Sequence, residues 1–165
     1  MAKKESFTPE EWTKVLESSM LAGMAVTAAE PSGLWGSMKE AFASSAVLAK
    51  SRQDPGATEL VKTVIAEFES PEGRAKLQEA LKQRLQGANA AEIVKRSLEN
   101  LREVSAILDA KAPGDAAAYK AWLQGISQKV AEAAKEGGTL GFGGVQVSDA
   151  EKLALEDIAK ALGTA

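Results

Sequence analysis

The sequence predicts an all-α protein of about seven helices in one compact bundle. Apolar residues recur at i, i+3 and i+4 spacing along most of the chain, and helix start and stop signals separate these stretches. No segment has the alternation and length of a convincing strand. The length of 165 residues suits a single domain over 1–165, in which residues 1–7 are expected to be a disordered tail.

The first helix is expected to begin after Thr8 and to run to about Ala29. Thr8 is a suitable N-cap, Pro9 suits the first helical position, and Glu11 lies three residues after the threonine. The proline and glycine of Glu30–Gly33 end this helix.

The next two helices are expected on either side of a turn at Asp54–Gly56. The second begins after Ser37, and the third covers about Ala57–Glu69. One side of the third helix is apolar and consists of Leu60, Val61, Val64, Ile65 and Phe68. Ser70 as cap and Pro71 as first residue begin the fourth helix. Leucines follow in it at steps of four: Leu77, Leu81 and Leu85.

Gly87–Asn89 and Ala112–Asp115 are the next two breaks, and Asp115 is expected to cap the sixth helix. The apolar residues of the fifth helix are Ile93, Val94, Leu98, Leu101, Val104 and Leu108. Those of the sixth helix are Tyr119, Trp122, Leu123, Ile126, Val130 and Ala133. Ser148 caps the seventh helix, which is expected to turn inward Leu153, Leu155, Ile158 and Leu162.

Composition excludes several classes of function. The chain has no cysteine and no histidine, which removes thiolate chemistry, serine triads and the usual zinc sites. A net charge of −3 argues against a nucleic-acid binder. The start of the chain has no signal-peptide pattern, and no apolar run is long enough to span a bilayer. A cytoplasmic protein without a cofactor is therefore expected, and a homo-oligomer stays open.

One pattern appears twice, in Gly33–Glu40 and in Gly144–Glu151. In both copies an apolar residue follows the glycine, a serine lies four residues after the glycine, and a glutamate lies three after the serine. This predicts two related helix–loop–helix units near the two ends of the domain, with each Ser–Glu pair acting as a capping box. The alternative is a hard-cation site built from nearby acidic residues: Glu30, Glu40, Glu136, Asp149 and Glu151.

Two aromatic residues in glycine-rich surroundings, Trp35 and Phe142, are candidates for contact with a partner or ligand. The glycines at 137–144 lack the Gly-Lys-Ser/Thr sequence and the preceding strand of a phosphate-binding loop. Small residues at 22–29 and 41–46 predict close packing of the first two helices. The alternative is a pocket for an apolar or lipid-like ligand between the first, second and sixth helices.

The stretches Ile126–Ala134, Gly144–Glu151 and Leu155–Gly163 resemble TerB-like domains, the all-helical tellurite-resistance B family of bacteria. The resemblance implies a bacterial interaction or sensing domain linked to stress, not an enzyme. The chain departs from the family where an Asp-Gly pair is expected, since it has Glu30–Gly33 and Glu136-Gly137 there.

The resulting prediction is a non-catalytic interaction or stress-response module with an unknown protein partner. A binder of a small apolar or lipid-like ligand is the first alternative. An enzyme that uses only carboxylates, lysine or Tyr119 is the second.

Overall fold

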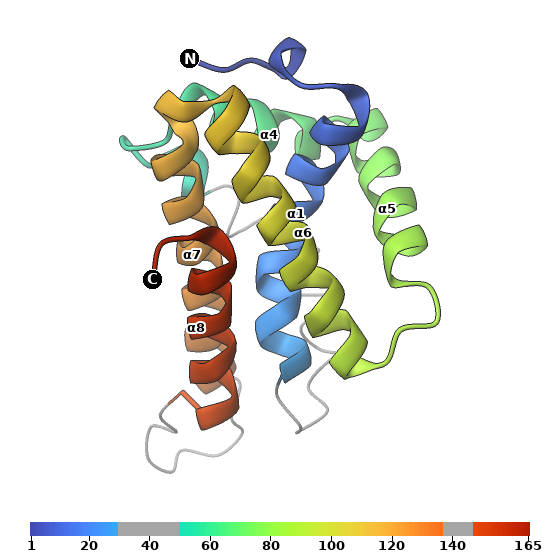
Figure 1. The fold of residues 1–165 in the computed structure, drawn as a ribbon, viewed down its shortest axis with the longest axis vertical. Coiled ribbons are helices and arrows are strands. Elements are labelled where there is room, and N and C mark those ends of the chain that lie inside the picture. Colours follow the sequence, from blue (N-terminus) through green and yellow to red (C-terminus); the bar gives the residue numbers. More distant parts are fainter. Residues whose placement is uncertain (30–49, 137–146) are drawn as a thin grey trace.

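The structure is a computed structural model that describes residues 1–29, 50–136 and 147–165. These residues form an all-α bundle, as predicted (Figure 1). The helices and the short 3₁₀ turn η1 are, in chain order, η1 Lys4–Ser6, α1 Pro9–Ala29, α4 Glu59–Glu69, α5 Pro71–Leu85, α6 Ala90–Lys111, α7 Pro113–Glu136 and α8 Asp149–Leu162.

Helix α1 is the central element and contacts α5, α6, α7 and α8. In Figure 1, α1, α5 and α7 run downward, whereas α6 and α8 run upward, so consecutive helices α5, α6, α7 and α8 alternate in direction. Helix α4 lies near the end at which α1 begins and contacts α5 and α7. The short connections produce this up-and-down packing, as expected from the sequence.

The helix starts follow the capping signals closely. The Thr8 hydroxyl accepts a hydrogen bond from the Glu11 amide at 3.2 Å, and the Glu11 carboxylate accepts one from the Thr8 amide at 2.8 Å. Ser70 caps α5, and Ser148 caps α8 in a capping box with Glu151. Helix α4 begins two residues later than predicted, because Thr58 is its N-cap.

The core contains most of the apolar residues predicted for it. Among the largest fully buried side chains are Leu21, Leu60, Ile65, Leu101, Leu108, Tyr119, Leu123, Ile126, Ile158 and Leu162. The prediction for Leu153 was wrong, since this side chain is 60% exposed. Ala154, Ile158 and Leu162 form the inward stripe of α8, and Leu153 lies with the exposed Glu156 and Asp157 on the opposite face.

The prediction that Asp115 caps a helix was also wrong. Helix α7 already begins at Pro113, a residue that suits the first helical position, so Asp115 lies inside its first turn. The Asp115 carboxylate is buried and accepts a hydrogen bond from the Ala2 amide, with 2.7 Å between N and Oδ2.

Residues 1–7, expected as a disordered tail, pack on the bundle instead. Ala2 and Phe7 belong to the core cluster. The rings of Phe7 and Trp12 lie 5.7 Å apart, and Lys4 forms an ion pair with Glu67 of α4. The hydrophobic contacts of Ala2 and Phe7 hold this segment in place, although the residues between them are polar.

The second predicted helix, the first copy of the repeated pattern and part of the second copy lie outside the described residues. The structural similarity of the two helix–loop–helix units therefore stays a prediction. The turn at Asp54–Gly56 is present, because the Ala57 amide donates to the Asp54 carbonyl at 3.0 Å.

Candidate functional site

The structure describes the side chains of two of the five residues predicted for the cation site, Asp149 and Glu151. Glu30 and Glu40 lie outside the described residues, and Glu136 is the last residue of α7, with its side chain outside the description. The Asp149 side chain is fully exposed, with its Oδ1 3.7 Å from Lys152 Nζ. Glu151 is buried and accepts a hydrogen bond from the Ser148 amide at 2.9 Å, which makes it a capping group.

The part of the chain that the structure describes contains no cluster of three or more acidic residues that could hold a metal ion. The two aromatic candidates for partner contact, Trp35 and Phe142, lie outside the described residues. The cation site and the partner contacts of the two aromatic residues therefore stay predictions.

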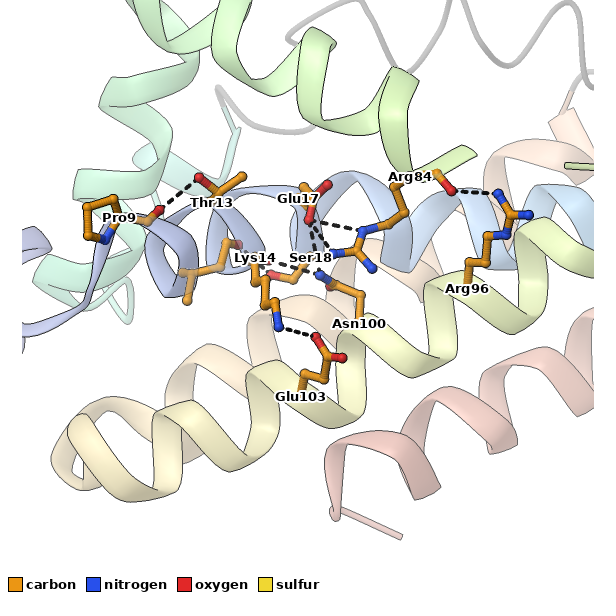
Figure 2. A network of polar contacts seen from close by, with 10 residues as sticks. Pro9, Thr13, Lys14, Glu17, Ser18, Arg84, Arg96, Asn100 and Glu103 are labelled. Atoms are coloured by element: carbon orange, nitrogen blue, oxygen red, sulfur yellow. Dashed lines mark hydrogen bonds and ion pairs between the residues drawn. The ribbon is translucent and has the colours of Figure 1, made fainter. Parts of the chain in front are cut away.

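The main polar site inside the bundle is centred on Glu17 of α1 (Figure 2). Glu17 is only 3% exposed. Its Oε2 accepts hydrogen bonds from Arg84 Nε at 3.1 Å and from Arg84 Nη2 at 2.9 Å. The guanidinium on α5 thus supplies the positive charge that a buried carboxylate needs.

Asn100 extends this site to α6. Its Nδ2 donates to the Lys14 carbonyl at 3.3 Å and to Glu17 Oε2 at 3.4 Å. Arg96, also on α6, donates to the Arg84 carbonyl at 2.7 Å and to the Gln86 carbonyl at 3.2 Å. A cation at these last carbonyls of α5 is favourable, because they carry partial negative charge. The set of side chains therefore joins α1, α5 and α6.

Two further polar atoms lie buried on α6. Ser97 Oγ and Asn100 Oδ1 have no hydrogen-bond partner among the described residues. Both residues are fully enclosed, so these oxygens are not available to a ligand that approaches from solvent.

Tyr119, a candidate catalytic group in the enzyme hypothesis, is held in the core. Its hydroxyl donates to the Val15 carbonyl at 3.0 Å and lies 3.4 Å from Ser18 Oγ. Burial raises the pKa of the Tyr119 hydroxyl above its ordinary value of 10.0, and the hydrogen bond with Ser18 offsets part of this rise. A neutral, enclosed phenol ties α7 to α1 and is poorly placed to exchange protons with a substrate.

Lysine in the interior has a similar structural role. Lys120 Nζ of α7 donates to both carboxylate oxygens of Asp109 on α6, at 2.7 and 2.8 Å. Lys120 itself is buried, whereas most of the Asp109 side chain is exposed. The pair links the end of α6 to the start of α7 across the short Ala112 connection.

An open groove of about 350 Å³ lies between residues 51–61 and α7. Its α7 wall carries small residues beside a large aromatic ring: Ala118, Ala121, Trp122 and Gly125. Asp54 and Lys129 supply opposite charges to its lining. A Cβ atom added at Gly125 would have no neighbour within 4 Å among the described residues, so this part of the wall has room for a side chain.

A second groove, of about 310 Å³, has a more polar lining. It lies where the N-terminal segment meets α4 and α5 and is lined by Lys4, Thr63, Glu67, Ser70, Glu72 and Lys76. Lys4 and Glu67 already pair with each other. The groove beside α7 is therefore the better candidate for an apolar contact.

Comparison with protein-family models, with curated proteins and with solved structures finds no match to this chain. The resemblance to TerB-like domains accordingly stays a prediction from the sequence. Among the helices of the described ranges, none combines the length and the apolar character needed to cross a bilayer.

Sequence reasoning did not identify the Glu17 site. Neither Glu17 nor Arg84 was among the residues that the sequence pattern indicated. One signal was available in α6, where Ser97 and Asn100 interrupt an apolar face formed by Leu101 and Val104. Polar residues on such a face indicate a buried hydrogen-bonding site.

Proposed function

We propose that this protein is a non-catalytic interaction module in which the groove between residues 51–61 and α7 contacts a protein partner. The observation that supports the proposal is the wall of the groove. Trp122 lies there among alanine and glycine residues, with Lys129 and Asp54 beside them. Tryptophan is enriched in the cores of protein–protein interfaces, and polar residues lie at their rims.

The chemistry of the interior agrees with a structural use of its charged groups. Arg84 neutralises Glu17, Asp109 pairs with Lys120, and Glu151 caps α8. An active site would need such groups to meet in a cleft open to substrate. A bacterial stress response is the biological setting that the TerB-like resemblance supports.

Site-specific photo-crosslinking in the native host tests this proposal. A photo-reactive residue in place of Ala121 in the groove should give an adduct of defined mass with one partner. The same residue in place of Asp157, on the exposed face of α8, is the matched control and should give none. Gly125→Leu should abolish the Ala121 adduct by filling the groove, without loss of helicity. Equal adducts at both positions, or an adduct insensitive to Gly125→Leu, would contradict the proposal.

A small apolar ligand in the same groove is the second candidate function. A volume of about 350 Å³ falls at the small end of ligand pockets. A lipid-like ligand should be visible by native mass spectrometry of the purified protein and should change Trp fluorescence. The change should disappear in Trp122→Phe and persist in Trp12→Phe; the opposite pattern would exclude this groove.

A further inference from the structure

Helix α5 is attached to the bundle with little apolar burial. It is the most polar of the described α-helices. Only Gly73 and Leu77 of its 15 residues are buried, whereas α4, with 11 residues, buries four apolar side chains. An isolated helix of about 15 residues is only marginally stable in water. The contacts of α5 with other helices therefore decide whether it stays folded.

The strongest of these contacts lie at the C-terminal end of α5. Arg84 is the cation for the buried Glu17 of α1, with 2.9 Å between Nη2 and Oε2. Arg96 of α6 donates to the carbonyls of Arg84 and Gln86 (Figure 2). These three charged side chains, Glu17, Arg84 and Arg96, form the clasp of α5. A polar clasp thus supplies what apolar burial supplies to the other helices.

The helices on either side of α5 have end signals of their own. Helix α4 ends where the Ser70 amide donates to the carbonyls of Ala66 and Glu67. Helix α6 begins with a capping box between Asn89 and Glu92. None of these hydrogen bonds uses a residue of α5. Loss of the α5 helix would therefore leave the end of α4 and the start of α6 intact.

The contacts that join the remaining helices also exclude α5. The Tyr119 hydroxyl ties α7 to the Val15 carbonyl of α1, and Ser105 Oγ of α6 donates to the Leu162 carbonyl of α8 at 3.0 Å. Helix α1 packs on α6, α7 and α8. Most of the large, fully buried side chains lie on these four helices. The core therefore persists when α5 leaves it.

We infer that α5 is an order–disorder element: it unfolds as one unit while α1, α6, α7 and α8 stay packed, and the clasp sets how often it does so. Segments with few buried apolar contacts open at a lower free energy than the core of the same protein. Opening brings the Glu17 carboxylate and the Asn100 amide, which are enclosed in the closed form, into contact with solvent. The buried ion pair is thus the switch between the two forms.

Hydrogen exchange of backbone amides tests this inference, because it reports local and global opening separately. The full chain is followed by mass spectrometry of peptides from α1, α5, α6 and α7. In the native protein the amides of residues 75–85 should exchange about tenfold or more faster than the slowest amides of α6 and α7. Exchange of α5 at the rates of those amides would overturn the inference.

Tyr119→Phe separates local from global opening. It weakens a contact that the open form keeps, so the slowest amides of α1 and α7 should exchange about two- to tenfold faster. The amides of α5 should keep their native rates, since their opening does not break this contact. An increase in α5 as large as that in α1 and α7 would show that α5 opens only with the whole fold.

Arg84→Ala tests the clasp and should raise exchange in α5 by about tenfold or more. Arg96→Ala, which spares the Glu17 ion pair, should act in the same direction and serves if Arg84→Ala does not fold. Arg102→Ala, at an exposed arginine of α6, is the matched control and should leave α5 unchanged. Native α5 rates in the clasp variants, or an equal increase in Arg102→Ala, would contradict the role of the clasp.

Discussion

Glu17 and Asp115 are carboxylates buried to nearly the same extent, with 3% and 4% exposed, but they have different partners. The Glu17 carboxylate accepts hydrogen bonds from two N–H groups of Arg84, a residue far along the chain. The Asp115 carboxylate accepts a hydrogen bond from the backbone amide of Ala2. Among the described residues, one carboxylate thus has its counter-charge in a side chain, and the other has only a neutral donor.

The difference shows how the molecule uses buried charge. At Glu17 the ion pair joins α1 to α5, and Asn100 adds α6, so the charge fixes the relation of three helices. At Asp115 the carboxylate fixes the N-terminal segment on the start of α7. In both places the charged group orients parts of the fold and is enclosed, which agrees with a structural role.

The largest expected effect comes from removing Arg84, the cation that pairs with Glu17. Arg84→Ala should lower the free energy of unfolding by about 3–5 kcal/mol, because it leaves Glu17 buried without a counter-charge. Urea denaturation measures this loss. Arg52→Ala, which removes an exposed pair with Glu69, is the control and should cost at most about 1 kcal/mol. Similar losses for the two variants would show that Glu17 does not depend on Arg84.

A smaller effect is expected at the second carboxylate, Asp115. Asp115→Ala should cost about 1–3 kcal/mol, since the buried Ala2 amide loses its acceptor. Limited proteolysis should then cut within residues 1–7, which the native protein protects. Unchanged protection would mean that Phe7 and Lys4 hold the segment without Asp115.

A buried neutral group provides a third comparison. Tyr119→Phe should cost about 0.5–1.5 kcal/mol through loss of the hydrogen bond to the Val15 carbonyl. The folded state raises the pKa of Tyr119, so its contribution is complete below the ordinary value of 10.0 and is lost as pH rises above it. Stability should therefore fall above pH 10 in the native protein and fall less steeply in Tyr119→Phe. Parallel pH profiles would contradict this.

The smallest effect belongs to an exposed carboxylate. The hydrogen bond from Lys111 and the Thr8 amide lower the pKa of Glu11 below its ordinary 4.5. A lowered pKa means that the contribution is present above about pH 4.5 and is lost as pH falls through the folded-state value. Glu11→Gln should reduce the acid dependence of the melting temperature only slightly, and salt should reduce it further. A large, salt-independent change would place Glu11 with the buried carboxylates.

Local signals in the sequence predicted much of the fold. The caps at Thr8, Ser70 and Ser148 depend on residues within three positions, so their spacing is sufficient to find them. Contacts between distant residues were not predictable in this way. Glu17 and Arg84 are 67 positions apart, and Ala2 and Asp115 are 113 apart.

The same reasoning explains two of the wrong assignments, those of Asp115 and Leu153. Asp115 has the residue type of a cap, but Pro113 begins the helix first. Leu153 is apolar, but the phase of α8 is set by Ala154, Ile158 and Leu162. Residue type alone predicted the wrong environment in both cases, because neighbouring residues determined the helix start and the buried face.

The coupling free energy between Glu17 and Arg84 tests most directly whether this fold needs the counter-charge at its buried ion pair. Urea denaturation gives the free energy of unfolding for the native protein, Arg84→Ala, Glu17→Ala and the double variant. The loss in the double variant should be clearly smaller than the sum of the two single losses, because no unpaired charge is left buried. A loss equal to that sum would contradict the account.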